Sequence, residues 1–565
     1  MDRRAMPDSP MAYSGADIVA VSPEVLKQDF ALRQWVESGG VVIVAGAPKL
    51  GSRVTQRPLG LGTVISAAPG NLAGDPNVWR PILERSATGN VFFSELKKTD
   101  GYYYALDYPA RGPNESKPPT AVGLASFLGL YIVMLVPANY LVLRRLRRKE
   151  LAWITIPALV AVFSLAAYLI GSAGMGKTLT VRRVNIAVTS AESQVASVTG
   201  QVRIFSPSRR RYDIRFSGAP MFAGDIRDYS DRSPFPALEV VEDRDSVCLP
   251  QADIYMWSTR RFALSGISDL GGRVSARFTT NGKEIRGTIR NDLPFELKDC
   301  VLCGDRVSEN IGDLKPGRTV SIARPLRDTW FRSPRAWRKP AGQLSANELL
   351  ESSLIRPRLI SGSAPGEMTL LGWTRNPPFE MTIDGRTPAS EEASALIVRI
   401  RPEWRPDASG RVSWSMAPES AQGDGYSGMY SYYRRRGGPR VAEITVDLQK
   451  DGTVLRYRLP VDQAQLDIRA LSLSCGVFPS SASDTENPTE RGNLPGVVRV
   501  EAYDYRAAAW SPIGETKSYG PLVLRVLNPR NAIGPGGDVR IKFSRKPAVA
   551  ISVRAPRLTF EGRLR

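Results

Sequence analysis

The sequence contains no histidine. Without an imidazole, the chain by itself cannot build a Ser–His–Asp triad, a Cys–His pair, a histidine zinc site or a histidine-ligated haem. Cysteine is also scarce: there are four, and none precedes Cys248. These two shortages exclude a large part of catalytic chemistry, so we expect neither enzymatic activity nor a bound cofactor or metal.

The 565 residues are enough for several domains, and with 42% hydrophobic and 23% charged residues most of them should be globular. The net charge of +20 is unevenly distributed, because residues 172–565 carry 58 basic and 43 acidic side chains. An excess of this kind fits anionic partners, namely lipid headgroups, acidic envelope polymers or nucleic acid. The simpler interpretation is a solvated surface rich in arginine.

The strongest feature of the sequence is a pair of long apolar runs. Residues 122–143 and 151–170 contain no charge, and each run has about the 20 residues that a helix needs to cross a bilayer. The turn between them, 144–150, is cationic and holds Arg144, Arg145, Arg147, Arg148 and Lys149. The alternative is a buried helical hairpin of a soluble protein. We predict two transmembrane helices with the lipid bilayer as partner. Asn139 and Thr155 each lie five residues from the turn, so they could share an interhelical hydrogen bond.

The cationic turn also predicts the topology. Cytoplasmic loops carry an excess of Lys and Arg, so residues 144–150 should be cytoplasmic and both soluble flanks extracytoplasmic. The protein would then be a multi-pass protein of the cell membrane, a location that argues against nucleic acid. The start, MDRRAMPDSPMAYSG, has no apolar signal core. Either an upstream signal or span is missing, which we favour, or the N-terminal region is cytoplasmic and the turn lies outside.

Residues 1–115 have the pattern of a partial α/β domain. A buried-strand pattern at 16–22 precedes helical spacing at 24–37, and a second buried strand follows at 41–45. Such a unit should be right-handed with parallel strands. Two strands do not make a stable sheet, so we expect neighbours at 62–66 and 91–93, or missing ones.

These residues resemble a known family. The stretch ADIVAVSPEVLKQDFALRQWVESGGVVIVAG resembles the class I glutamine amidotransferase-like, flavodoxin-like domain of uncharacterised bacterial membrane proteins, in which a two-helix hairpin and β-rich extracytoplasmic domains follow. The stretches PLGLGTVIS and LYIVMLVPANYLVLRRLRRKELAWITIPAL are similar to that family's following strand and hairpin. The catalytic cysteine and histidine of amidotransferases have no counterparts. The resemblance therefore implies a fold and a cell-envelope location, but no activity.

After residue 178 the pattern changes to short strands separated by turn residues. We expect a β-sandwich region at 178–340, including a hairpin of 273–279 and 284–290 around Asn281-Gly282. Residues 341–436 read as a mixed β region with one helix at 345–355 and a linker at 404–440. Residues 437–565 suggest a second sandwich or jelly roll, with strands at 441–448, 454–459, 466–474, 497–504, 522–527, 539–543 and 548–553. The predicted fold class is thus a multidomain membrane protein: partial α/β segment, transmembrane α-hairpin, then mostly-β sandwich domains.

Three motifs have both a functional and a structural interpretation. Residues 171–178 match the phosphate-binding loop, but an apolar helix precedes them and a strand pattern follows, where the motif needs the reverse order. Cys300 and Cys303 form a CxxC within a strand, so they should be buried thiols that do not bond to each other, while Cys248 or Cys475 could pair across sheets. Residues 324–339 interleave cations with three aromatic rings, which suits a membrane interface or a loop packed on the sandwich.

The function expected from these observations is a non-enzymatic envelope protein. Its extracytoplasmic domains would bind or scaffold envelope components, anionic polymers or co-encoded membrane proteins. One alternative is a glycan-acting enzyme that uses carboxylates alone, for which Glu242, Asp243 and Asp245 are the candidates, although this acidic run also reads as a solvated loop. The other alternative is a nucleotide-linked transport component, which depends only on the 171–178 match.

Overall fold

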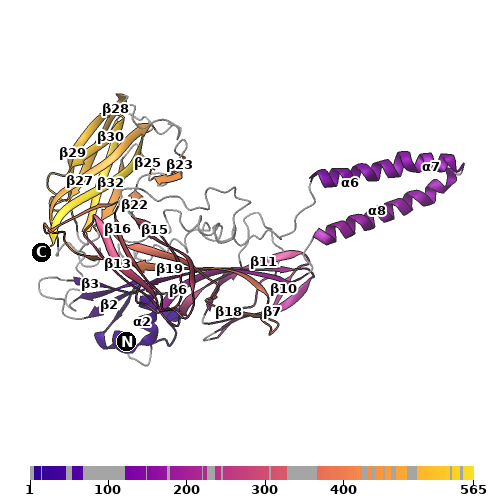
Figure 1. Ribbon diagram of the computed structural model, residues 1–565, viewed down its shortest axis with the longest axis horizontal. Coiled ribbons are helices and arrows are strands. Elements are labelled where there is room, and N and C mark those ends of the chain that lie inside the picture. The colour runs from indigo at the N-terminus through magenta and orange to yellow at the C-terminus, as the bar shows by residue number, and fades with distance from the viewer. Residues whose placement is uncertain are drawn as a thin grey trace.

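The protein is mostly β, with one helical hairpin projecting from it (Figure 1). The computed structural model describes residues 6–13, 15–45, 54–67, 121–147, 149–174, 178–218, 220–225, 236–243, 246–304, 307–326, 366–416, 418, 420–422, 431–434, 440–443, 445–448, 452–459, 466–479, 493–534, 537–546 and 551–564. The expected strand at 91–93 and the expected helix at 345–355 lie outside these ranges.

The N-terminal unit is a small α/β assembly. In chain order its elements are η2 (Pro10–Tyr13), β1 (Val19–Val21), α1 (Pro23–Gln28), α2 (Phe30–Glu37), β2 (Val41–Ala45), β3 (Val54–Leu59) and β4 (Gly62–Ala67). The sheet order is β1-β2-β4-β3, with β2 parallel to both β1 and β4 and with β3 antiparallel to β4. Strand, helix and parallel strand are present as the sequence predicts. A flavodoxin-like domain is not evident from the described residues.

The single helix expected at 24–37 is divided in two at Asp29. Asp29 has an extended backbone, and its Oδ1 accepts a hydrogen bond from the backbone N of Leu32 at 2.8 Å. This is the N-cap arrangement, in which a short acidic side chain satisfies an amide of the first turn. α2 then buries Leu32, Trp35 and Val36 against the sheet.

The hairpin consists of two long apolar helices. The first comprises α6 (Ala121–Val133), a π-helical turn η4 (Met134–Ala138) and α7 (Asn139–Arg145). After the short η5 (Lys149–Leu151), α8 (Ala152–Gly174) forms the second helix. The π turn contains Pro137, which has no N–H to donate and so disturbs the regular ladder at that point.

Residues 180–404 form the region called here the β-body. Its strands are β5 (Thr180–Ser190), β6 (Val195–Ser206), β7 (Arg210–Ser217), β8 (Pro220–Asp225), β9 (Val241–Glu242), β10 (Ser246–Ile254), β11 (Ser258–Asp269), β12 (Val274–Thr280), β13 (Glu284–Asn291), β14 (Leu297–Gly304), β15 (Val307–Leu314), β16 (Thr319–Pro325), β17 (Met368–Thr374), β18 (Glu380–Ile383), β19 (Ser390–Ile400) and β20 (Glu403–Trp404). The hairpin predicted around Asn281-Gly282 is confirmed as β12–β13.

One eight-stranded sheet dominates the β-body. Its order is β15-β14-β17-β19-β5-β6-β11-β8, and two four-stranded sheets, β18-β7-β10-β9 and β16-β13-β12-β20, share its apolar core. Because β17 and β19 pair within the same sheet as β5 and β14, the boundary expected at residue 340 does not separate two folding units. The cause is a parallel pairing of β5 with β19, which joins strands about two hundred residues apart.

The C-terminal sandwich has two five-stranded sheets, β21-β32-β27-β30 with β25 on β32, and β22-β26-β31-β28-β29. The strands are β21 (Arg411–Met416), β22 (Ser420–Gln422), β25 (Thr445–Asp447), β26 (Thr453–Arg458), β27 (Leu466–Pro479), β28 (Asn493–Asp504), β29 (Ala509–Ser518), β30 (Gly520–Arg525), β31 (Asp538–Lys546) and β32 (Ile551–Leu564), and β23 (Ser431–Arg434) pairs separately with β24 (Arg440–Glu443). The linker expected at 404–440 was therefore wrong in part, since β21 is a strand that alternately buries Val412, Trp414 and Met416.

The N-terminal unit is docked on the β-body. Ser193, in the turn between β5 and β6, donates a hydrogen bond from Oγ to Oε2 of Glu37 at 2.9 Å. Residues of α2 also lie close to β6, and η2 lies close to β11. These contacts are made by α2 and η2, and not by a strand of the small sheet. The unit lies at the end of the β-body away from the hairpin (Figure 1), and not beside the point where the helices emerge.

Candidate functional site

The surface of the hairpin is apolar and uncovered. The spans Val122–Arg145 and Ala152–Ile170 are long and apolar enough to cross a membrane, and only 6% of the first and 0% of the second is buried by the rest of the protein. The two helices contact each other through Phe163, whose ring centroid lies 5.6 Å from that of Phe127 and 5.2 Å from that of Tyr131.

The hydrogen bond predicted between Asn139 and Thr155 is wrong. Thr155 Oγ1 is buried and has no hydrogen-bond partner among the described residues. The helices are joined instead by aromatic packing on Phe163.

The cationic turn lies at the tip of the hairpin. Arg144, Arg145 and Arg147 are exposed; Arg148 lies outside the described residues, and only the backbone of Lys149 is described. Arg147 has a φ of 56°, the left-handed conformation that ends a helix, and its backbone N donates to the carbonyl of Arg144 at 3.2 Å. Cations at this position also interact favourably with the helix dipole.

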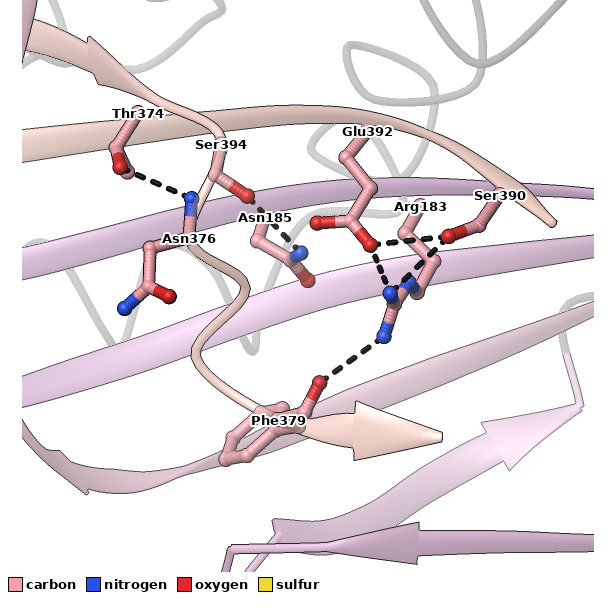
Figure 2. Close-up of polar contacts among 8 residues, drawn as sticks. All are labelled: Arg183, Asn185, Thr374, Asn376, Phe379, Ser390, Glu392 and Ser394. Atoms are coloured by element: carbon pink, nitrogen blue, oxygen red, sulfur yellow. Dashed lines mark hydrogen bonds and ion pairs between the residues drawn. The ribbon is translucent and has the colours of Figure 1, made fainter. Parts of the chain in front are cut away.

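A buried polar network crosses the parallel pair β5–β19 (Figure 2). Arg183 Nη2 forms an ion pair with Glu392 Oε1 and donates to Ser390 Oγ at 3.1 Å, while Nη1 donates to the carbonyl of Phe379 at 3.0 Å. Ser390 Oγ donates to the same carboxylate oxygen at 3.0 Å. Two positions along, Asn185 Nδ2 donates to Ser394 Oγ at 3.2 Å.

This network has the properties of a structural clamp. Its side chains come from β5 and β19, the segment before β18 supplies the backbone carbonyl of Phe379, and burial lowers the pKa of Arg183 from its ordinary value. Each hydrogen bond and ion pair named above joins two parts of the protein. Among the described residues, no cluster of three or more Cys, Asp or Glu side chains could hold a metal ion. The network therefore fixes how the three segments pair, and sequence reasoning missed it because the partners are distant in the chain.

The four cysteines are all described and all free. Cys300 and Cys303 lie in β14, are fully buried, and do not bond to each other, as the strand geometry predicts. The open alternative, a disulfide of Cys248 or Cys475, is not formed. Burial raises the pKa of Cys300 and of Cys475 to about 12, so neither is a ready thiolate nucleophile.

The structure does not assemble a site from the other sequence motifs, namely the phosphate-loop match, the acidic run and the cationic–aromatic segment. Residues 171–174 continue α8, 175–177 lie outside the described residues, and β5 follows, so the order is helix then strand. Glu242 lies in the short edge strand β9, Asp243 follows it, and Asp245 is outside the described residues. Of 324–339, only the part up to residue 326 is described.

A cluster of charged and aromatic side chains lies on one face of the sheet β22-β26-β31-β28-β29. Asp538 accepts from Arg456 Nε at 2.5 Å, from Arg540 Nε at 2.9 Å and from Tyr505 Oη at 2.5 Å. Burial acts to raise the pKa of Asp538, but the hydrogen bonds from Tyr505 and Arg456 and the charges of the arginines hold it below its ordinary value. Burial and the hydrogen bond to Asp538 raise the pKa of Tyr505.

Aromatic rings and further cations continue this cluster across the face. Tyr503 contacts Tyr505 and Trp510 edge-on, with ring centroids 5.0 and 5.2 Å apart. Arg540 lies over Tyr503 at 5.9 Å, and Lys542 lies over Trp510 at 5.8 Å. Tyr503, Arg540 and Lys542 alternate with the buried positions of β28 and β31, so they point away from the interior of the sandwich, and Trp510 is the cross-strand partner of Tyr503. We call them the aromatic–cationic face.

Comparison with known proteins adds a family match to part of the chain. Residues 273–403, which contain β12–β19, match the family model described as "Domain of unknown function (DUF8725)". No curated protein matches the sequence.

Similar solved structures include the CBM22-1 xylan-binding domain from Paenibacillus barcinonensis Xyn10C, at 10% identity and a TM-score of 0.16 over 26% of this chain and 85% of that one. They also include the yeast delta-COP-I mu-homology domain complexed with Dsl1 WxWxV peptide, at 8% identity and a TM-score of 0.19 over 40% of this chain and 97% of that one. At these TM-scores neither likeness supports a statement about fold or function.

Proposed function

We propose that the protein is a non-enzymatic, membrane-anchored protein of the cell envelope. Residues 122–143 and 151–170 cross the membrane, the turn 144–150 is cytoplasmic, and the β-body and C-terminal sandwich lie outside, where they bind or scaffold envelope components or neighbouring membrane proteins. In this proposal the N-terminal unit is a partial domain of the amidotransferase-like, flavodoxin-like type without catalytic residues.

The distribution of exposed apolar side chains carries this proposal. In the described part of the chain, 22 exposed large apolar side chains lie in the hairpin, and only six lie elsewhere. Removing each from water is worth about 1.5–3 kcal/mol. A hairpin that left them all in water would be strongly aggregating, whereas a bilayer covers both helices along their full length.

The test uses the full chain with its four cysteines replaced by serine or alanine. The protein should remain in the membrane fraction after alkaline carbonate washing. A cysteine at Arg147 should react with a membrane-impermeant thiol reagent only after lysis, while a control cysteine at the exposed Gln194 should react in intact cells. Extraction by carbonate would contradict membrane insertion, and reaction at position 147 without lysis would contradict the orientation.

A second candidate function, binding of an anionic polymer, is supported by the aromatic–cationic face. Aromatic rings offer broad apolar surfaces to a chain of rings, and Arg540 and Lys542 offer positive charge beside them. We expect the full chain in detergent to bind an acidic polysaccharide such as alginate in a salt-sensitive way, and Trp510→Ala with Lys542→Gln to weaken it. Unchanged binding by this variant would exclude the face as the binding site.

A further inference from the structure

The end of the second helix is tied closely to the β-body. α8 ends at Gly174 and β5 begins at Thr180, so six residue steps separate them. Six residues span at most about 20 Å even when fully extended. The first residues of β5 must therefore stay near the point where the helix leaves the apolar core of a bilayer.

The strand register brings two turns to this same end. Thr180 pairs with Phe205 on β6, so the turn that follows β6 lies beside the start of β5. Ser258 on β11 pairs with Ser206, which places the turn between β10 and β11 there as well. In Figure 1 the corresponding ends of β7, β10 and β11 are the part of the β-body nearest the hairpin.

These two turns carry the side chains of a membrane interface. Arg209 and Arg210 expose 67% and 63% of their side chains, and Arg211 is also exposed. Met256 is 54% exposed, one of six large apolar side chains that are exposed outside the hairpin in the described part of the chain. Trp257 beside it is half-buried and has a φ of 54°, a strained conformation for a bulky residue. Cations with an amphipathic aromatic and an exposed apolar side chain are typical of contacts with the headgroup region.

Acidic side chains only partly offset the charge. Arg209 lies 3.3 Å from Asp253 and Arg210 lies 3.2 Å from Asp384, and both pairs leave the arginine largely in water. Asp213 is occupied in accepting hydrogen bonds from the backbone and side-chain amides of Gln251. Exposed pairs of this kind are weak and exchange readily with other anions.

We propose that residues 207–211 and 255–258, here called the membrane-facing edge, rest on the bilayer surface and bind anionic lipid headgroups. The guanidinium groups contact headgroup phosphates, and Met256 with Trp257 enters the boundary between headgroups and acyl chains. This proposal rests on the insertion of the hairpin but not on its orientation, because β5 leaves the membrane at the end of α8 on either side.

The experiment uses the cysteine-free full chain with a single cysteine returned at one of three positions and labelled with a fluorescent thiol reagent. The labelled protein is reconstituted into vesicles. A fraction of the lipid carries a quencher, either at the headgroup or in the acyl chain. Ser208 is the test position, Val133 reports on the hairpin, and Gln194 is the control. β5 has 11 residues and is about 35 Å long, so Gln194 lies well beyond the reach of the bilayer surface.

The expected result is strong headgroup quenching at position 208 in phosphatidylglycerol vesicles, weaker quenching in phosphatidylcholine vesicles, and none at 194. Arg209→Gln should reduce the ratio of quenched to unquenched label at 208 by up to roughly fivefold. This is the factor in binding that one cation contributes near an anionic membrane surface. Arg273→Gln is the matched control, since Arg273 is an exposed arginine paired with Glu192 at the opposite end of the β-body.

The outcomes separate the two proposals. Absence of acyl-chain quenching at 133 would overturn the insertion of the hairpin itself. Quenching at 133 with equally little quenching at 208 and 194 would overturn the membrane-facing edge alone, and would mean that a protein or solvent covers it. Equal quenching at 208 in both vesicle types would overturn the preference for anionic headgroups.

Discussion

The β-body and the C-terminal sandwich place their polar networks differently. In the β-body the network of Arg183 and Glu392 is buried and spans the parallel pair β5–β19, whose strands are far apart in the chain. In the C-terminal sandwich every strand pair among the described residues is antiparallel, and the network around Asp538, also buried, lies on the side of its sheet that faces away from the sandwich interior. The register of antiparallel neighbours is set by their short connections and by their apolar pattern. A parallel pair of strands that are distant in the chain has no short connection to set its register.

The difference suggests separate roles for the two networks. The charges of β5 and β19 oppose one another in register, Arg182 with Glu391 and Arg183 with Glu392; a slip by one residue would leave at most one arginine opposite a glutamate, and a slip by two would leave none. The network of the sandwich joins antiparallel neighbours, so it is not needed for register, although its central carboxylate is equally buried: the Asp538 side chain is 7% exposed and that of Glu392 is 13% exposed. The network of the β-body thus specifies a pairing between distant strands, whereas in the sandwich the partly exposed side chains around Asp538, among them Arg540 and Trp510, are the ones that a ligand could reach.

The contact between the two regions should be the most sensitive point. Gly282 has a φ of 86°, and a Cβ there would collide with the backbone carbonyl oxygen of Ser413 in β21. We expect Gly282→Ala to lower the free energy of unfolding by roughly 3–5 kcal/mol, through backbone strain and overpacking together. Gly312 has a φ of 74° and open space around it, so Gly312→Ala measures strain alone. Equal losses in chemical denaturation of the two variants would show that the regions do not abut there.

Removing Glu392 tests the role of the buried network. Glu392→Ala leaves the guanidinium of Arg183 buried and without its carboxylate, which should cost about 3–5 kcal/mol of unfolding free energy. Glu391→Ala breaks the neighbouring pair with Arg182, but the Glu391 side chain is 67% exposed, so the loss should be about 1 kcal/mol or less. Chemical denaturation of both variants measures these two losses. Similar losses would mean that the buried pair does not specify the β5–β19 register.

The outer network should contribute less, and its contribution should depend on pH. Asp538→Asn removes a charge that accepts from Arg456, Arg540 and Tyr505, and we expect a loss of about 1.5–3 kcal/mol at neutral pH. The pKa of Asp538 is lower in the folded than in the unfolded state. Its stabilisation is therefore complete above the unfolded pKa of about 3.9 and is lost as the pH falls through the folded value.

Thermal melts of wild type and Asp538→Asn from pH 6 downward check this sign. The difference between them should be constant above about pH 5 and should shrink below about pH 4 as the wild-type carboxylate takes up its proton. A difference that grows on acidification would mean that Asp538 is protonated in the folded protein at neutral pH.

How far the sequence predicts this structure depends on whether the signal is local. The hairpin and β12–β13 follow from nearby residues, and so do most strands of the C-terminal sandwich. β29 was missed because AWSPIGETKS alternates weakly and contains a proline and a glycine. The β5–β19 pairing and the Arg183 network were not predictable, because no local pattern identifies a partner about two hundred residues away. The two long apolar helices were predicted correctly from composition, but the contact between them was not, since it depends on aromatic packing.

The smallest expected effect is at the tip of the hairpin, where neither β region contributes. Arg147 adopts a φ of 56°, a conformation that costs an L-residue about 1–2 kcal/mol and a glycine nothing. Arg147→Gly should therefore stabilise the turn by about 0.5–1 kcal/mol, because the loss of one cation at a helix end offsets part of the gain. Arg145→Gly is the matched control: it removes the same charge at the last residue of α7, where the backbone is helical and glycine is unfavourable, and should destabilise by up to about 1 kcal/mol. Unfolding of the full chain by a denaturing detergent in mixed micelles measures both. A loss of similar size in the two variants would show that charge, and not backbone conformation, determines the stability of this turn.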